Sequence, residues 1–180
     1  MSISLAQLGG RELTRVVYSA EEIGQRVKDM GREITEAYEP ADNVLVVGLL
    51  KGSFIFLADL VRAIDLPLHV DFLVASSYGS DTVSSGDVQL LYDPEASIEG
   101  RTVILVEDIV DSGNTMKRLI PLLEERNPKS LEICALLHKR VTKLDTEPRW
   151  VGFDAPNEFL VGYGLDYSES FRHLPYIGSL

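Results

Sequence analysis

Three carboxylates lie within five residues of one another, at Glu107, Asp108 and Asp111. The apolar run Val103–Val106 before them is typical of a buried strand, and Ser112–Thr115 after them leads into an amphipathic helix. The first turn of a helix offers backbone N–H groups and a positive dipole end, which together can bind a phosphate. Adjacent carboxylates would repel that phosphate, but they can bind sugar hydroxyls or a cation. The segment therefore predicts a site for a phosphorylated sugar.

A simpler interpretation is an acidic loop in which Asp111 or Ser112 caps an ordinary helix. For any one of these residues the two interpretations are equally good. A cap does not require three carboxylates, however, so the whole string favours a ligand site. The sequence has neither a G-x-x-x-x-G-K-[ST] phosphate loop nor a G-x-G-x-x-G turn after a strand, which argues against those two nucleotide-binding motifs.

Other segments combine residue types that could contribute to such a site. Lys51 follows an apolar run, residues 76–87 form a polar stretch rich in serine, and Lys139 stands at the end of another apolar run. Each has an ordinary explanation when taken alone: a solvated cation, a hairpin tip and a charged strand end. Phe159 alone is more typical of a core residue than of a stacking surface.

The string from Val103 to Thr115 resembles the PRPP-binding motif of type I phosphoribosyltransferases, where PRPP is 5-phosphoribosyl-1-pyrophosphate. The resemblance extends over nearly the whole chain and narrows to the hypoxanthine-guanine branch of that family. It implies an α/β fold, with a parallel sheet flanked by helices and a small base-binding hood built from both ends of the sequence. The implied reaction is transfer of the 5-phosphoribosyl group to N9 of hypoxanthine or guanine, which yields IMP or GMP and pyrophosphate.

The resemblance also implies a role for each residue that matches the motif. Asp111 would be the general base that takes a proton from the purine ring near N7. Glu107 and Asp108 would bind the ribose hydroxyls, and Asp166 together with this acidic pair would hold Mg²⁺. The ammonium of Lys139 would donate to the purine 6-oxo group and thereby reject adenine, whose amino group is a donor. The residues expected to bind PRPP or the purine are Glu107, Asp108, Ser112, Gly113, Asn114, Thr115, Lys51, Gly52, Ser77, Tyr78, Lys139, Phe159, Leu160 and Arg172.

Further roles follow from the same resemblance. Leu50–Gly52 would form a pyrophosphate loop with a non-proline cis peptide, and Arg172 would pair with pyrophosphate oxygens. Residues 76–88 would form a mobile loop that closes over the reacting centre and excludes water. Phe159 would stack on the purine ring, while the backbone of Leu160 would meet the edge of the base.

The pattern of helices and strands would position these residues at one edge of a sheet. Ser19 and Glu22 form a capping-box pattern that begins a helix. The remaining expected helices are Phe54–Ile64 and about Asn114–Glu125, and the expected strands are Asn43–Leu50, His69–Ser76, Val88–Tyr92, Thr102–Val106 and Leu131–Leu137. Strands that alternate with helices predict a parallel sheet, and ligands bind beyond the carboxyl ends of such strands. Trp150–Tyr167 predicts strands and loops.

The composition predicts one domain over residues 1–180, with 45% hydrophobic residues. The formal net charge of −11 argues against broad binding to nucleic acid or to an anionic membrane. The sequence predicts neither a signal peptide nor a membrane span, and the lone Cys134 is typical of a buried small hydrophobe, so we expect a cytoplasmic protein. The family resemblance implies a homodimer or homotetramer.

Two other functions fit parts of the same pattern. A PRPP-sensing regulator would keep the phosphate turn and lose the residues for the base, but Lys139, Phe159 and Asp166 are all present. A transferase for another base is the second alternative. Lys139 disfavours adenine, whereas xanthine stays open.

Overall fold

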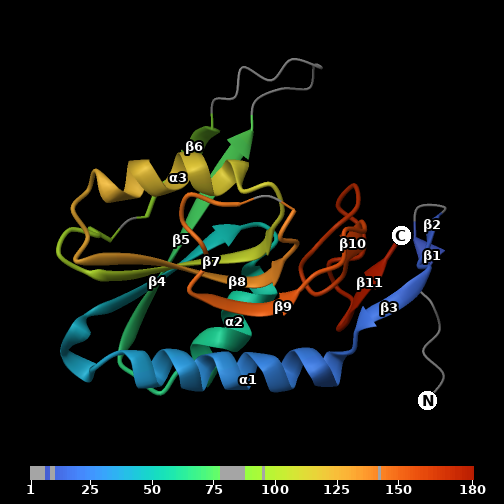
Figure 1. Ribbon diagram of the computed structural model, residues 1–180, viewed down its shortest axis with the longest axis horizontal. Helices are drawn as coiled ribbons and strands as arrows, with labels where there is room; N and C mark the ends of the chain where they lie inside the picture. Colours follow the sequence, from blue (N-terminus) through green and yellow to red (C-terminus); the bar gives the residue numbers. More distant parts are fainter. Residues whose placement is uncertain (1–6, 9–10, 78–87, 95, 142) are drawn as a thin grey trace.

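The computed structural model describes residues 7, 8, 11–77, 88–94, 96–141 and 143–180, and its centre is a mostly parallel sheet (Figure 1). Its strands, in spatial order, are β6 (Val88–Tyr92), β5 (Leu68–Ser77), β4 (Val44–Leu50), β7 (Thr102–Val110), β8 (Ser130–His138) and β9 (Trp150–Asp154). Neighbouring strands from β5 to β9 are parallel, and β6 adds to β5 in the antiparallel direction. The sheet confirms the predicted α/β class.

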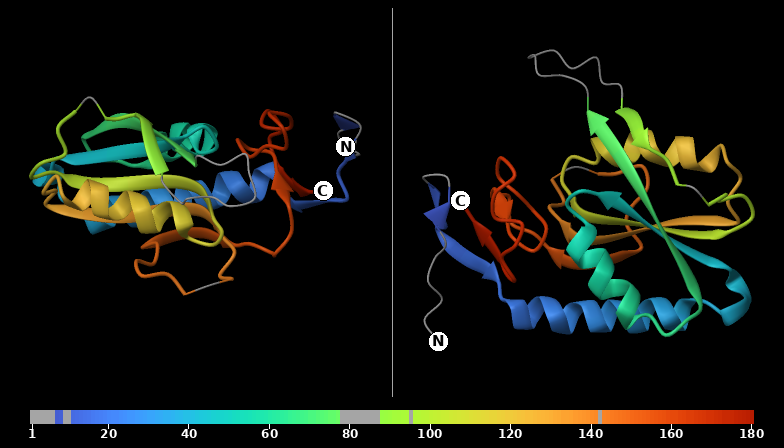
Figure 2. Two further views of the ribbon diagram at one scale, coloured as in Figure 1. Left: turned by 90° about the horizontal axis from the view of Figure 1, so that it is seen from above. Right: turned by 180° about the vertical axis from the view of Figure 1, so that it is seen from behind.

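Helices cover both faces of the sheet. α1 (Ala20–Ala37) and α2 (Phe54–Ala63) lie on one side and α3 (Asn114–Glu124) lies on the other, as Figure 2 shows from behind. In β4, Val46 packs toward α1 and α2, whereas its neighbour Val47 packs toward α3. Both faces of the sheet are thus covered and shielded from water. The central strands are therefore continuous apolar runs and do not alternate apolar with polar residues.

A second, smaller sheet stands beside the carboxyl ends of the main strands (Figure 1). It consists of β10 (Leu160–Val161), β11 (Ile177–Ser179) and β3 (Arg15–Tyr18), all antiparallel. We call this sheet and residues 162–176 the hood. β1 (Gln7–Leu8) and β2 (Arg11–Glu12) pair with each other next to β3. The hood therefore joins early and late parts of the sequence, as the family resemblance implied.

Most predicted elements are present, with ends that differ by one residue or two. Ser19 caps α1 with the full capping box: its hydroxyl accepts from Glu22 N at 3.2 Å, and the Glu22 carboxylate accepts from Ser19 N at 2.8 Å. One strand end was wrong. β7 continues to Val110 rather than ending at Val106, so Glu107 and Asp108 lie within the strand. β4 leaves the ladder after Val106, but β8 keeps pairing with β7 as far as Val110.

Among the described residues, no helix is both long enough and apolar enough to cross a membrane.

Two glycines of α1 give a test of helix packing. A Cβ on Gly31 would lie 2.5 Å from the carbonyl oxygen of Ala63 in α2, while a Cβ on Gly24 would meet no atom within 4 Å. We predict that Gly31→Ala destabilises the protein by about 1–3 kcal/mol, because α2 must move away. Gly24→Ala should stabilise it by up to about 1 kcal/mol, through helix propensity alone. Urea unfolding of both variants measures these changes, and equal effects would contradict the packing argument.

Candidate active site

The predicted phosphate turn lies between β7 and α3. Gly113 is the residue before the helix and has φ +73°, a left-handed conformation that favours glycine. A Cβ there would also lie 2.2 Å from Leu144, whose side chain packs against the turn. A small pocket is lined by Glu107 and by residues 109–116, with the first residues of α3 on its wall. The turn therefore presents a helix N-terminus to a pocket, which suits a phosphate group.

The acidic pair lies in the part of β7 that β4 no longer covers. Because successive side chains of a strand alternate in direction, Glu107 and Asp108 point to opposite faces. Glu107 lines the pocket of the turn, and Asp108 points to Gly52, where a Cβ would lie 1.7 Å from the Asp108 carboxylate. The structure therefore brings the loop predicted to bind pyrophosphate directly against Asp108, on the opposite face from Glu107.

Both carboxylates are costly to ionise in the free protein. Glu107 is 8% exposed, and its Oε2 atom has no hydrogen-bond partner among the described residues. Burial, followed by repulsion from Asp108, raises the pKa of Glu107 well above its usual value. Burial also raises the pKa of Asp108 to about 6, although the hydrogen bond from Ile109 N at 2.9 Å opposes this rise. Ligand hydroxyls or a cation would relieve this desolvation.

Lys51 and Arg172, the two cations expected to bind pyrophosphate, share one carboxylate. Lys51 follows a cis peptide bond from Leu50, as the resemblance implied, and its Nζ atom lies 3.0 Å from Glu169 Oε1. The other oxygen of Glu169 lies 3.2 Å from Arg172 Nη2, which also lies 2.8 Å from Asp166 Oδ1. These contacts hold the pKa of Glu169 below its usual value, with the Lys51 hydrogen bond contributing most.

Glu169 was missed by the sequence analysis. It lies three residues before Arg172, but its contact with Lys51 spans 118 positions of the chain and has no local signal. The backbones of the same two segments also approach closely, since a Cβ on Gly164 would lie 2.1 Å from the carbonyl oxygen of Gly52. The hood and the sheet thus meet at this point.

Lys139 and Asp111 form an ion pair beside the turn. The Lys139 Nζ atom donates to Asp111 Oδ2 at 2.8 Å, and the Lys139 backbone N–H donates to Val110 O at 3.0 Å. The Lys139 side chain is largely buried, while that of Asp111 is half exposed. Two residues predicted to act on the base are therefore in direct contact, with Asp111 open to a ligand.

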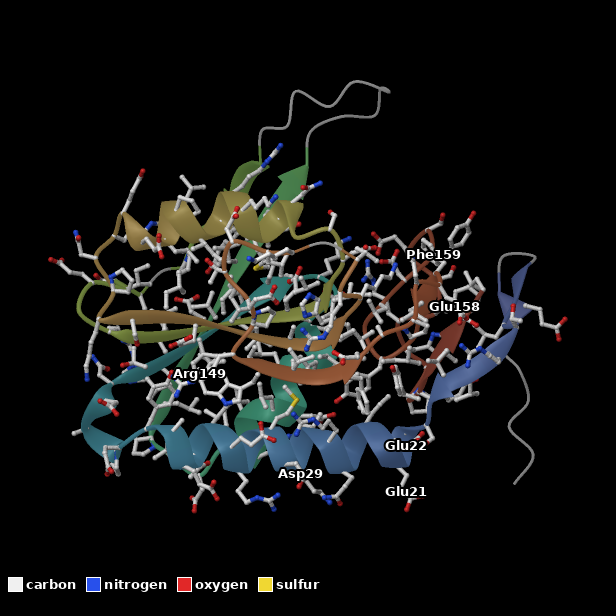
Figure 3. All side chains as sticks on the ribbon, in the orientation of Figure 1. Glu21, Glu22, Asp29, Arg149, Glu158 and Phe159 are labelled. Carbon is white, nitrogen blue, oxygen red and sulfur yellow. The ribbon has the colours of Figure 1, made fainter. Side chains whose placement is uncertain are left out.

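The aromatic residue expected to stack on a base is exposed. Phe159 directly precedes β10, lies at the surface beside the hood (Figure 3) and is 53% exposed. Tyr167 packs edge-on against it, with ring centroids 5.7 Å apart. The core location that burial habits favour for Phe159 is therefore wrong. Leu160 is buried in β10 beside it, and Leu180 N donates to Phe159 O at 3.0 Å, so the backbone under the ring is held in place.

The predicted mobile loop lies mostly outside the described residues. The residues of this loop outside the description are Tyr78 and residues 79–87. Ser77 is the last residue of β5, and its backbone pairs with that of Val88 in β6.

The carboxylates fit a hard divalent cation only in part. Among the residues that the structure describes, no group of three or more histidine, cysteine, aspartate or glutamate side chains is arranged to hold a metal unaided. Glu107 has an unpartnered buried oxygen, and Asp166 offers oxygens to Arg172 and to Glu169 N. One or two such carboxylates, completed by waters and ligand phosphates, are the usual surroundings of Mg²⁺.

Known proteins resemble this chain over most of its length. Residues 16–168 match the phosphoribosyl transferase domain. The chain is 47% identical over 169 residues to the hypoxanthine-guanine phosphoribosyltransferase of Dictyostelium discoideum, covering 92% of this chain and 94% of that protein. It is 46% identical over 179 residues to the bifunctional protein TilS/HprT of Listeria monocytogenes. That match covers 96% of this chain but 28% of the longer Listeria protein.

A solved structure has the same architecture. A hypoxanthine phosphoribosyltransferase from Staphylococcus aureus aligns with a TM-score of 0.88 at 44% identity, over 93% of this chain and 91% of that one.

The raised pKa of Asp108 predicts a stability change with pH. The carboxyl is neutral in both states well below about pH 4. The cost of burying it therefore builds up between about pH 4, where the unfolded chain ionises, and about pH 6, where the folded protein ionises. We predict that Asp108→Asn, which can still accept from Ile109 N, gains roughly 1–3 kcal/mol of unfolding free energy over wild type between pH 4 and pH 7. Urea titrations across this range measure the gain. Asp145→Asn, at an exposed position, is the charge control, and a gain independent of pH would contradict the burial argument.

Proposed function

The chain belongs to the phosphoribosyl transferase domain family, and we propose that it transfers the 5-phosphoribosyl group of PRPP to N9 of hypoxanthine or guanine. The products are IMP or GMP and pyrophosphate, so the enzyme serves purine salvage. The relatives with this activity in their names support the assignment. The observation that carries it is the contact of Lys139 with Asp111 beside the phosphate turn, because this pair places a donor and a proton acceptor together.

PRPP would occupy three neighbouring parts of the site. The amides of residues 111–115 would hold the 5-phosphate, as the pocket at the start of α3 allows. Glu107 and Asp108 would accept hydrogen bonds from the ribose hydroxyls. Lys51 and Arg172 would bind the pyrophosphate, since both cations lie where the loop after β4 meets the hood.

Magnesium would complete the binding of PRPP. Asp166 and Asp108 would hold Mg²⁺ through carboxylate oxygens and waters, whereas Glu107, which was also expected to bind the ion, points to the opposite face of β7. When bound, the ion supplies neutralising charge to the departing pyrophosphate. This local neutralisation explains how a chain with a net charge of −11 can bind a highly anionic substrate.

The purine would lie between the hood and the end of β8. Phe159 offers an exposed ring for stacking, and the nearby backbone of Leu160 can meet the edge of the base. The Lys139 ammonium would donate a hydrogen bond to the 6-oxo group of the purine. The amino group at this position of adenine is itself a donor and cannot accept that hydrogen bond. The family resemblance implies that contacts to the 2-position would be mostly with backbone, so side-chain identities do not set the preference between hypoxanthine, guanine and xanthine.

Substitution takes place at the anomeric carbon of the ribose. N9 forms its bond there as the bond to pyrophosphate breaks, and the ribose ring carries positive charge in between. Asp111 takes the purine proton near N7 as general base. The loop of residues 76–88, including Ser77 and Tyr78, would exclude water from this cation-like state. We further propose a cytoplasmic homodimer or homotetramer, with residues 1–180 as one domain.

Substrate panels test the proposal directly. Purified protein with PRPP and Mg²⁺ should release pyrophosphate with hypoxanthine or guanine, and should be inactive with adenine or without metal. Nucleotide formation and pyrophosphate release are both followed, base by base. Turnover of xanthine alone would replace the substrate assignment, and binding of PRPP without turnover of any base would favour a regulatory protein instead.

Asp111→Asn tests the general base. Asparagine keeps an oxygen that can accept from Lys139, but it cannot take a proton, so we predict a fall in turnover of about 10²- to 10⁴-fold. PRPP binding should change little. Single-turnover kinetics and a binding titration measure the two effects separately, and unchanged turnover would remove Asp111 from the mechanism.

A further inference from the structure

Glu169 occupies the position between the two cations that the proposed reaction assigns to pyrophosphate. One carboxylate oxygen lies 3.0 Å from Lys51 Nζ, and the other lies 3.2 Å from Arg172 Nη2. Asp166 also contacts Arg172, at 2.8 Å. Two cations therefore face two carboxylates, so the positive charge of this subsite is already neutralised in the free protein.

The two carboxylates are held very differently. Asp166 is the more buried, with 28% of its side chain exposed, and its Oδ2 atom accepts from Glu169 N at 2.8 Å. The Glu169 side chain is 66% exposed, as is its partner Lys51 at 68%. Ion pairs this exposed are weak, because water competes for both charges. The Glu169 carboxylate can thus leave while Asp166 stays.

The surrounding backbone does not have to move when Glu169 leaves. The Glu169 N–H is fixed by Asp166, and φ is +65° at Glu169 itself, which places the residue in a tight turn. Arg172 keeps its own position through the hydrogen bond from Nη1 to Gly164 O at 2.8 Å. Rotation of one side chain is therefore enough to uncover Lys51 and to remove one of the two carboxylates from Arg172.

We propose that Glu169 is an internal competitor for the pyrophosphate group: it occupies Lys51 and Arg172 in the free enzyme, and the pyrophosphate of PRPP displaces it. The inference rests on the proposed function, since it requires these cations to bind pyrophosphate. Glu169 then lowers the affinity for PRPP, and it promotes release of product pyrophosphate by returning to the cations. It sets affinity and takes no part in bond making.

Glu169→Gln tests the proposal, because glutamine has nearly the same shape and lacks the charge. The dissociation constant of pyrophosphate with Mg²⁺, measured by calorimetric titration, should fall about three- to tenfold, the size expected for the loss of two weak ion pairs that share one exposed carboxylate. KM for PRPP should fall by a similar factor without a rise in kcat, and pyrophosphate should become a stronger product inhibitor. Glu33→Gln makes the same charge change on α1, where Glu33 pairs with Arg26, and should leave these values unchanged.

A second variant separates competition from support of the loop. If Glu169 acts by neutralising Lys51, then Glu169→Gln should tighten pyrophosphate binding much less in a Lys51→Gln background. Weaker or unchanged pyrophosphate binding in the single variant, with wild-type thermal stability, would overturn the proposal. A lowered thermal stability together with weaker binding would also overturn it, since Glu169 would then be a structural support.

Wild-type turnover distinguishes this inference from the proposed function. If the wild type converts no purine base, the proposed function fails, and the inference fails with it. If the wild type is active and Glu169→Gln does not bind pyrophosphate more tightly, only the inference fails.

Discussion

Burial of two adjacent carboxylates is the constraint around which this structure is arranged. Glu107 and Asp108 lie within a strand, with raised pKa values and with one carboxylate oxygen lacking a partner among the described residues. Such groups persist only if the surrounding structure over-determines their position. The ladder between β7 and β8, the dry core on both sheet faces and the glycine at position 52 all do so. The stability that burial removes from the free protein is available as binding energy for a polar ligand.

Much of this arrangement follows from local sequence. The apolar runs, the capping box at Ser19 and the turn at Gly113 are short-range patterns, and each led to the right element. The end of β7 did not, because a pair of carboxylates usually marks the end of a strand. Here the strand continues because β8 pairs with it beyond the point where β4 turns away, and pairing with a distant strand has no local signature.

Parts of the site whose residues are neighbours in the sequence could be predicted, and parts that depend on contacts between distant segments could not. The predicted phosphate turn is continuous in sequence, so its residue types and spacing were sufficient to predict a turn between a strand and a helix there. The exposure of Phe159 and the bridging position of Glu169 depend on contacts between the hood and the sheet. Only the family resemblance pointed to Phe159, and nothing pointed to Glu169. The family resemblance pointed to Gly52, whereas Gly164 carried no signal of its own, and the close approach of their backbones joins the hood to the sheet.

The order of the hood along the chain affects how the protein is made. β11 completes the small sheet by pairing with β3, although it is translated after every strand of the main sheet. The small sheet therefore cannot be completed until the last residues of the chain have been made, whereas every strand of the main sheet has been made before them. Base recognition, which we propose to need the hood, can arise only once this sheet is complete. A polypeptide released early, before residues 177–179, would keep a phosphate turn and lack an assembled platform for the purine.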